Sequence, residues 1–122
     1  MSIRILYLDH ESNNLNSMMA TFRRDGEVFL AKSTDEGLDI LRENKIDVVF
    51  ADHHMPGITG LEFLKMVSEE FPVSRRILLT GHAYNEEFKH AIKMGYVHHY
   101  INKPWDEQEL RGLINIDLTS DL

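Results

Sequence analysis

Short apolar runs alternate with segments in which apolar residues recur every three or four positions. The apolar runs are typical of strands, and the recurring pattern is typical of helices with one buried face. The sequence therefore predicts five strands: Ile3–Leu8, Glu27–Ala31, Ile46–Ala51, Arg75–Thr80 and Val97–Ile101. A helix is predicted after each strand, within residues 12–22, 33–41, 59–67, 86–94 and 106–114. Repeated strand–helix units indicate an α/β fold with a parallel sheet, right-handed crossovers and helices on both faces.

Capping residues mark several of the predicted helix ends. Gly26 and Gly95 suit the ends of the first and fourth helices, because glycine tolerates the left-handed conformation found there. Ser33–Glu36 has a capping-box pattern, and Asp106–Glu109 has a similar N-cap arrangement. Residues 117–122 either finish the last helix or begin a linker.

The third strand is the most informative stretch of the chain. Val48–Ala51 contains only apolar residues, as expected for a strand that is buried on both faces. Asp52 follows where this strand should surface, and Pro56 and Gly57 then break the chain before the next helix. Open α/β sheets bind ligands at the carboxyl ends of their strands. A carboxylate is therefore expected at the edge where such a fold carries its chemistry.

The composition indicates one globular domain of 122 residues, with 43% hydrophobic residues and a formal charge of −7. The negative charge argues against direct nucleic-acid binding by this domain. The sequence has no cysteine, no apolar run long enough for a membrane span and no signal-peptide pattern at its first residues. We therefore expect a cytoplasmic protein without membrane contact.

Polar side chains follow four of the predicted strands. Asp9 and His10 follow the first strand, Asp52 the third, Thr80 ends the fourth, and Lys103 comes just after the fifth. In a parallel sheet these strand ends share one edge, so the side chains should converge. Two carboxylates, a hydroxyl and an ammonium group suit phosphoryl transfer, in which a carboxylate can attack phosphorus and a divalent cation can neutralise charge.

Four motifs together resemble a known family, the receiver domain of two-component response regulators. They are Ile5–Glu11, Asp52–Glu62, Ile77–Gly81 and Tyr100–Pro104, in order and each at a strand end. The resemblance covers nearly the whole chain, so residues 1–122 are expected to form one receiver domain. It implies a flavodoxin-like (βα)5 fold with strand order 2-1-3-4-5, which places Asp9 opposite Asp52.

The resemblance also implies the roles of the residues at this edge. Asp52 matches the phosphoacceptor, and Lys103 matches the lysine that pairs with the aspartate or the phosphoryl oxygens. Asp9, Asp52 and the backbone carbonyl of His54 match the ligands of the metal, usually Mg2+. In this family the peptide bond between Lys103 and Pro104 is commonly cis.

The implied function is a phosphorylation-dependent signalling switch rather than a metabolic enzyme, since it would catalyse only its own phosphorylation and dephosphorylation. The phosphoryl group would come from a sensor histidine kinase or a phosphotransfer protein. Thr80 matches the hydroxyl that moves onto the phosphoryl group, and Tyr100 matches the aromatic residue that swings inward behind it. The surface of the fourth helix, fifth strand and fifth helix would then signal to a downstream effector domain or protein. The resemblance also allows a homodimer.

His10 is the main departure from the family, which usually has a second acidic metal ligand at this position. Mg2+ prefers oxygen ligands, whereas imidazole suits Mn2+ or another transition metal better. Three outcomes are open: weaker Mg2+ binding, replacement by Glu11, or preference for a softer metal. Alternatively, His10 takes part only in hydrogen bonding to Asp9 or Asp52. In that case the domain could be a degenerate receiver that binds proteins without being phosphorylated.

Other histidines also depart from the family. His54 and His82 stand at the two positions that flank the path of the hydrolytic water, and both can titrate near neutrality. We expect them to modulate hydrolysis and to make the acyl-phosphate lifetime depend on pH between about 6 and 8. His98 and His99 replace residues that are often acidic in receivers, so charged dimer contacts should differ. His53 is expected to be a surface or half-buried residue.

Two further functions fit parts of the pattern. A flavodoxin-like cofactor binder would need a phosphate-binding loop rich in glycine, serine or threonine after the first strand, where this chain has Asp9–Ser12. An aspartate-nucleophile phosphatase usually has a second acid two residues after the nucleophile, and His54 occupies that position.

Overall fold

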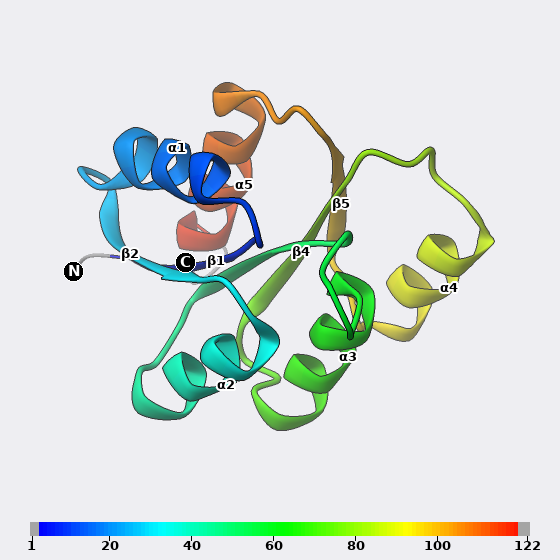
Figure 1. The fold of residues 1–122 in the computed structure, drawn as a ribbon. Coiled ribbons are helices and arrows are strands. Elements are labelled where there is room, and N and C mark those ends of the chain that lie inside the picture. The colour runs from blue at the N-terminus through cyan, green and yellow to red at the C-terminus, as the bar shows by residue number, and fades with distance from the viewer. Residues whose placement is uncertain (1–2, 120–122) are drawn as a thin grey trace.

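The computed structural model describes residues 3–119 and contains one five-stranded parallel sheet (Figure 1). The strand order is β2-β1-β3-β4-β5, which confirms the predicted fold class and topology. The strands are β1 (Ile3–Leu8), β2 (Gly26–Ala31), β3 (Val48–Asp52), β4 (Arg75–Thr80) and β5 (His99–Asn102). The helices are α1 (Ser12–Phe22), α2 (Thr34–Glu43), α3 (Gly60–Glu70), α4 (Glu86–Met94) and α5 (Glu107–Thr119).

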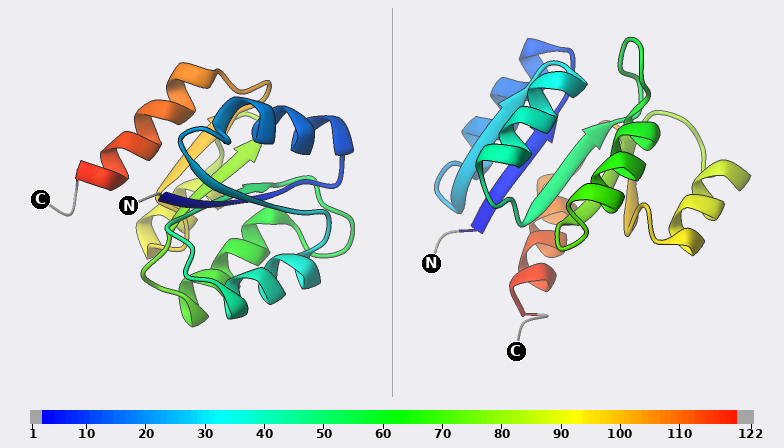
Figure 2. Two further views of the ribbon diagram at one scale, coloured as in Figure 1. Left: turned by 90° about the vertical axis from the view of Figure 1, so that its left-hand side faces the viewer. Right: turned by 90° about the horizontal axis from the view of Figure 1, so that it is seen from below.

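Helices cover both faces of the sheet: α1 and α5 lie on one face, and α2, α3 and α4 on the other (Figures 1 and 2). The hydrophobic core is accordingly divided into two layers. In β1, Ile5 and Tyr7 join the layer under α1 and α5, whereas Leu6 and Leu8 join the other layer. This alternation follows from the two-residue period of a strand and explains why β1 is apolar and buried from Ile5 to Leu8.

The central strand β3 carries Asp52 to the carboxyl edge of the sheet. All five residues of β3 are buried, because β1 and β4 flank it and helices cover both of its faces. The parallel register with β4 sets Asp52 beside Leu79, one residue before Thr80. The apolar run predicted from the sequence is thus the middle of the sheet.

Several predicted boundaries were wrong. The third strand runs from Val48 to Asp52 rather than from Ile46 to Ala51. Gly26 does not end the first helix, which stops at Phe22, but begins β2. A Cβ atom at Gly26 would lie 2.1 Å from the carbonyl oxygen of Ile3, so this strand start tolerates no side chain. The last strand begins at His99 rather than Val97, and His98 instead pairs with Arg76 of β4 through a side-chain acceptor.

The capping predictions agree with the structure at three other positions. Gly95 ends α4 with φ 82°, and Asp106 accepts a hydrogen bond from the Glu109 N–H. Ser33 caps α2 by accepting from the Glu36 N–H, although the Glu36 carboxylate accepts from the N–H of Lys32 rather than that of Ser33. Of the residues 117–122, those up to 119 belong to α5 and the others lie outside the described residues.

Arg76 links two backbone segments at the amino-terminal edge of the sheet, opposite the edge that carries Asp52. Sequence analysis did not predict this role. The Arg76 side chain is only 5% exposed and donates to four backbone carbonyl groups, those of Pro72, Ser74, Gly95 and Tyr96. These carbonyl groups belong to the segment before β4 and to the end of α4, so one guanidinium group joins the two segments.

Within residues 3–119, no helix is both long and apolar enough to cross a membrane.

Candidate functional site

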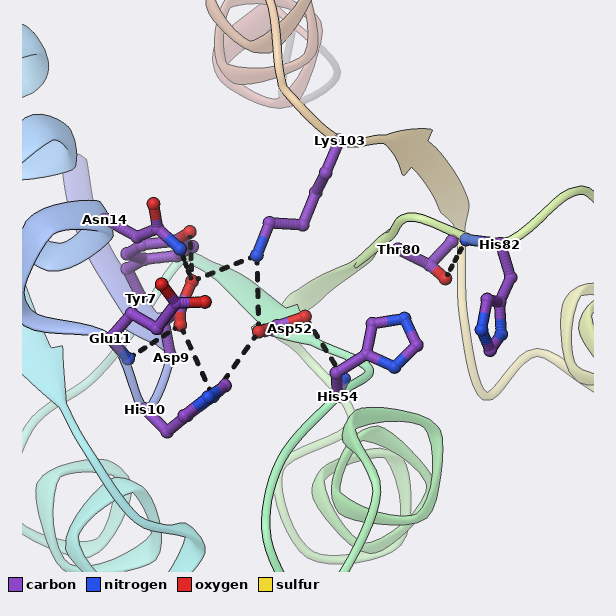
Figure 3. Close-up of polar contacts among 10 residues, drawn as sticks. All are labelled: Tyr7, Asp9, His10, Glu11, Asn14, Asp52, His54, Thr80, His82 and Lys103. Atoms are coloured by element: carbon purple, nitrogen blue, oxygen red, sulfur yellow. Dashed lines mark hydrogen bonds and ion pairs between the residues drawn. The ribbon is translucent and has the colours of Figure 1, made fainter.

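Four of the predicted site residues meet at the carboxyl edge of the sheet (Figure 3). The Lys103 Nζ lies 3.3 Å from Oδ2 of Asp52 and 3.4 Å from Oδ2 of Asp9. The His10 Nδ1 lies 3.8 Å from Oδ1 of Asp9 and 3.8 Å from Oδ2 of Asp52. The two carboxylates are almost fully buried, whereas the His10 side chain is 40% exposed. A lysine and an imidazole therefore bridge the same two buried acids.

The chain around Asp52 is packed too closely for any residue but glycine at the start of α3. A Cβ atom on Gly60 would lie 2.2 Å from the carbonyl oxygen of Asp52. The Gly60 N–H donates to the carbonyl group of His53, and Thr59 and Glu62 close a capping box on α3. The first turn of α3 therefore lies directly against the end of β3 and fixes the backbone that carries Asp52.

Asp9 is held by hydrogen bonds from three directions. Its Oδ2 accepts from the Tyr7 hydroxyl at 2.8 Å and from the Asn14 side-chain amide at 3.0 Å, and its Oδ1 accepts from the Glu11 N–H at 3.0 Å. Burial by itself raises the pKa of Asp9, but hydrogen bonds from Glu11 and Tyr7 and the charge of Lys103 outweigh burial and lower it. Asp9 is therefore ionised at neutral pH.

The two carboxylate oxygens of Asp52 differ in their hydrogen bonding. Its Oδ1 accepts a hydrogen bond from the His54 N–H at 3.1 Å. Its Oδ2 is buried and accepts no hydrogen bond from the described residues, although Lys103 is close enough for an ion pair. A buried carboxylate oxygen with electrostatic compensation but no donor is suited to bind a cation or to attack phosphorus.

Asp9, His10 and Asp52 form a group that fits a metal ion. Each offers one ligand atom, and these atoms lie within 4.8 Å of one another. Two oxygens and one imidazole nitrogen make a softer donor set than the all-oxygen set that Mg2+ prefers. Glu11 donates its backbone N–H to Asp9, and its carboxylate is not part of this group.

Thr80 and Tyr100 lie farther along the same edge. The Thr80 side chain is fully buried, and its hydroxyl accepts a hydrogen bond from the His82 N–H at 3.0 Å. Figure 3 shows Thr80 on the side of Asp52 away from Asp9. Tyr100 is half-buried, and its ring centroid lies 4.8 Å from that of Tyr84 and 6.0 Å from that of Phe88 in α4.

Three histidines form a cluster of rings beside the site. His54 and His82 are exposed, and their ring centroids lie 4.4 Å apart. His53 is half-buried, as expected, but its ring also meets that of Phe88 edge-on, with the centroids 5.2 Å apart. Burial and then the neighbouring His54 lower the pKa of His53. The cluster connects the loop after Asp52 with the loop after Thr80 and with α4.

Sequence analysis missed two residues that contact the site, Tyr7 and Asn14. Tyr7 precedes Asp9 by two residues, so the period of the strand puts both on the same face. Asn14 lies in the first turn of α1, five residues after Asp9. The strand spacing was a usable signal for Tyr7, whereas the position of Asn14 depends on how α1 leaves β1.

Comparison with known proteins gives consistent matches. Residues 5–115 match the family described as response regulator receiver domain. The hydrogenase transcriptional regulatory protein HoxA of Cupriavidus necator is 32% identical over 101 residues, which are 83% of this chain and 21% of HoxA. The chain thus spans about a fifth of the length of this curated relative.

Two solved structures are also closely similar. A response regulator receiver domain protein from Clostridium thermocellum is 34% identical, with a TM-score of 0.88 and coverage of 98% of this chain and 96% of that one. The signal receiver domain of an HD domain-containing protein from Pseudomonas fluorescens is 26% identical, with a TM-score of 0.90 and coverage of 98% and 97%.

Proposed function

Because this chain belongs to the response regulator receiver family of two-component signalling proteins, we propose that it is a switch controlled by phosphorylation of Asp52. The family match supports phosphorylation-dependent signalling in general. The assignment to Asp52 rests mainly on one observation: its buried Oδ2 has no hydrogen-bond donor but lies 3.3 Å from the Lys103 ammonium group. This oxygen is the free nucleophile of the site.

The proposed reaction moves a phosphoryl group from a phosphohistidine on a sensor kinase or phosphotransfer protein to Asp52. The Asp52 oxygen forms a bond to phosphorus, the phosphorus–nitrogen bond breaks, and the histidine nitrogen keeps the electron pair and takes up a proton. Lys103 stabilises the charge on the phosphoryl oxygens. Reversal of the signal is hydrolysis, in which water attacks phosphorus and the carboxylate leaves. His54 and His82 stand beside this path and are proposed to modulate it.

A divalent cation is part of the proposal, and Asp9, His10 and Asp52 would hold it with the backbone carbonyl of His54. When bound, it would neutralise phosphoryl charge and orient the donor. The imidazole of His10 supports weaker use of Mg2+ and better use of Mn2+ or another transition metal.

Output is proposed to occur through the surface of α4, β5 and α5. The His82 N–H donates to the Thr80 hydroxyl, so a shift of Thr80 toward a phosphoryl group would also move His82. The ring of His53 contacts that of Phe88, which in turn contacts Tyr100. These contacts support coupling from the site to α4 and β5. A downstream effector would respond to that surface, and the relative HoxA, named as a transcriptional regulator, supports control of transcription.

A degenerate receiver is the second candidate, because His10 removes a negative charge from the metal site. Such a domain would bind its partner without phosphorylation of Asp52. The two candidates differ in one measurable property, covalent labelling at Asp52.

The test is incubation with acetyl phosphate in Mg2+ or in Mn2+, followed by intact mass spectrometry. We expect one phosphoryl group on the wild-type domain, with more labelling in Mn2+ than in Mg2+, and none on Asp52→Asn. His10→Asp should raise labelling in Mg2+. Asp35→Asn makes the same change at an exposed position in α2 and should label like the wild type. No labelling with either metal would favour the degenerate receiver, and labelling that survives Asp52→Asn would refute the assigned acceptor.

A further inference from the structure

Tyr7 is a buried tyrosine beneath the site, and we propose that it is a positioning residue for metal binding. In this proposal its hydroxyl holds the Asp9 carboxylate so that only Oδ1 faces the cation. The inference rests on the proposed function, since it concerns the cation bound by Asp9, His10 and Asp52.

The position of Tyr7 explains how its hydroxyl reaches the carboxylate. Tyr7 and Asp9 are two residues apart along β1, and the hydroxyl donates to the Asp9 Oδ2 at 2.8 Å. Tyr7 has no exposed surface and packs in the core layer under α1 and α5.

The donors around Asp9 are divided unequally between its two oxygens. Oδ2 accepts from Tyr7 at 2.8 Å and from Asn14 at 3.0 Å, and Lys103 approaches the same atom at 3.4 Å. Three donors occupy the directions in which this oxygen could bind a metal ion. Oδ1 accepts one backbone hydrogen bond, from Glu11, and lies 3.8 Å from the His10 Nδ1. Asp9 is therefore arranged to bind a cation through Oδ1 alone.

The hydroxyl of Tyr7 thus sets the plane of the carboxylate. Without it, Oδ2 would keep the Asn14 amide and Lys103, but the carboxylate could rotate toward either of them. Loss of a hydrogen bond that orients a metal ligand typically weakens metal affinity by about 10- to 100-fold. We expect a weakening of about tenfold for Tyr7→Phe, because Asn14 still restrains the group.

A purely structural role makes a different prediction. In that role, Asp9 serves only as the acceptor that the buried Tyr7 hydroxyl needs. Removal of the hydroxyl should then change the stability of the domain and leave its metal affinity unaltered. Metal affinity, measured separately from stability, therefore distinguishes positioning from packing.

The experiment is isothermal titration calorimetry of the domain with Mn2+ and with Mg2+, beside thermal unfolding without metal. Tyr7→Phe keeps the buried ring and removes only the hydroxyl. Tyr96→Phe is the matched control. It also removes one tyrosine hydroxyl, from a residue whose backbone carbonyl accepts a hydrogen bond from the Arg76 side chain at the opposite edge of the sheet. Asn14→Ala removes the second donor to the same oxygen and serves if Tyr7→Phe does not fold.

We expect Tyr7→Phe and Asn14→Ala to bind the preferred metal about tenfold more weakly than the wild type and Tyr96→Phe. If the wild type binds metal and both variants bind it equally well, the positioning role is overturned while the proposed function stands. If the wild type itself binds neither metal, the metal site of the proposed function fails and this inference fails with it.

Discussion

Asp9 and Asp52 are two almost fully buried carboxylates that share one ammonium group. The ligand atoms of the two carboxylates lie within 4.8 Å of each other. Two negative charges that close repel each other strongly in a poorly solvated site. Lys103 compensates for this repulsion, and its side chain is itself only 19% exposed. His10 lies 3.8 Å from each carboxylate, too far for a hydrogen bond, and its side chain is 40% exposed. Lys103 is therefore a structural requirement of the site as well as a proposed catalytic group.

Replacing Lys103 by methionine should destabilise the domain. Removal of one partner from a buried charge network leaves the other charges uncompensated, and such losses reach about 3 kcal/mol. The measurement is urea unfolding of the metal-free domain. If the folded domain binds Mn2+ as proposed, titration with Mn2+ should recover part of the loss. Lys89→Met, an exposed change on α4, should have little effect. Equal stability of the two variants would contradict the role assigned to Lys103.

At the scale of elements, the site depends on how closely α3 approaches the end of β3. The capping box of Thr59 and Glu62 begins α3 immediately after the loop that contains His54. Gly60 then contacts the backbone of Asp52 at a distance that excludes a side chain. The first turn of α3 therefore determines where β3 and its residue Asp52 end, although α3 contributes no side chain to the group of potential metal ligands.

The two glycine-to-alanine changes at Gly60 and Gly112 should have opposite effects. Gly60→Ala places a methyl group against the carbonyl of Asp52, so it should destabilise the domain by roughly 2 kcal/mol or more, as overpacking does. Gly112 lies exposed in α5 with no atom within 4 Å of an added Cβ. Gly112→Ala should therefore stabilise the domain by roughly 0.5–1 kcal/mol through helix propensity. Denaturant unfolding measures both, and a tolerated Gly60→Ala would show that α3 can move away from β3.

At the scale of the whole molecule, the two edges of the sheet differ in chemistry. The carboxyl edge gathers the acids, Lys103 and the ring cluster. The amino-terminal edge holds the buried Arg76, whose N–H donates to the Nδ1 of His98 at 2.9 Å. Burial, followed by the charges of Arg76 and Arg75, lowers the pKa of His98 to about 4. His98 is therefore neutral in the folded protein at pH values where the unfolded chain would protonate it.

This difference makes stability depend on pH. Below about pH 6.5 the unfolded chain protonates His98 while the folded domain does not, so the contribution of His98 decreases as pH falls toward about 4. The slope for one proton is at most about 1.4 kcal/mol per pH unit. His98→Gln keeps an acceptor for the Arg76 N–H and should flatten the curve of unfolding free energy against pH. His90→Gln, at an exposed position of α4, should leave the wild-type slope, and equal slopes for the two variants would refute a buried neutral His98.

The sequence by itself determined the elements and the edge at which the polar residues gather. The apolar run of β3 specifies a strand covered on both faces, and alternating strand–helix units specify a parallel sheet. Because all strands then end at one edge, Asp9, Asp52 and Lys103 could be predicted to converge. These conclusions follow from periodicity and chain direction, which are local properties of a sequence.

Only the tertiary structure decided which atoms of these residues meet. Lys103 contacts Asp9 across 94 positions of the chain, and Arg76 is satisfied by carbonyl groups from two separate segments. Gly26 was misassigned because a glycine is required there by the close approach of the Ile3 carbonyl in the neighbouring strand, which the sequence does not show. Hydrogen bonds and close contacts of this kind are sensitive to small differences in the distance between segments. Packing of the helices against the sheet sets those distances, and no local pattern in the chain encodes them.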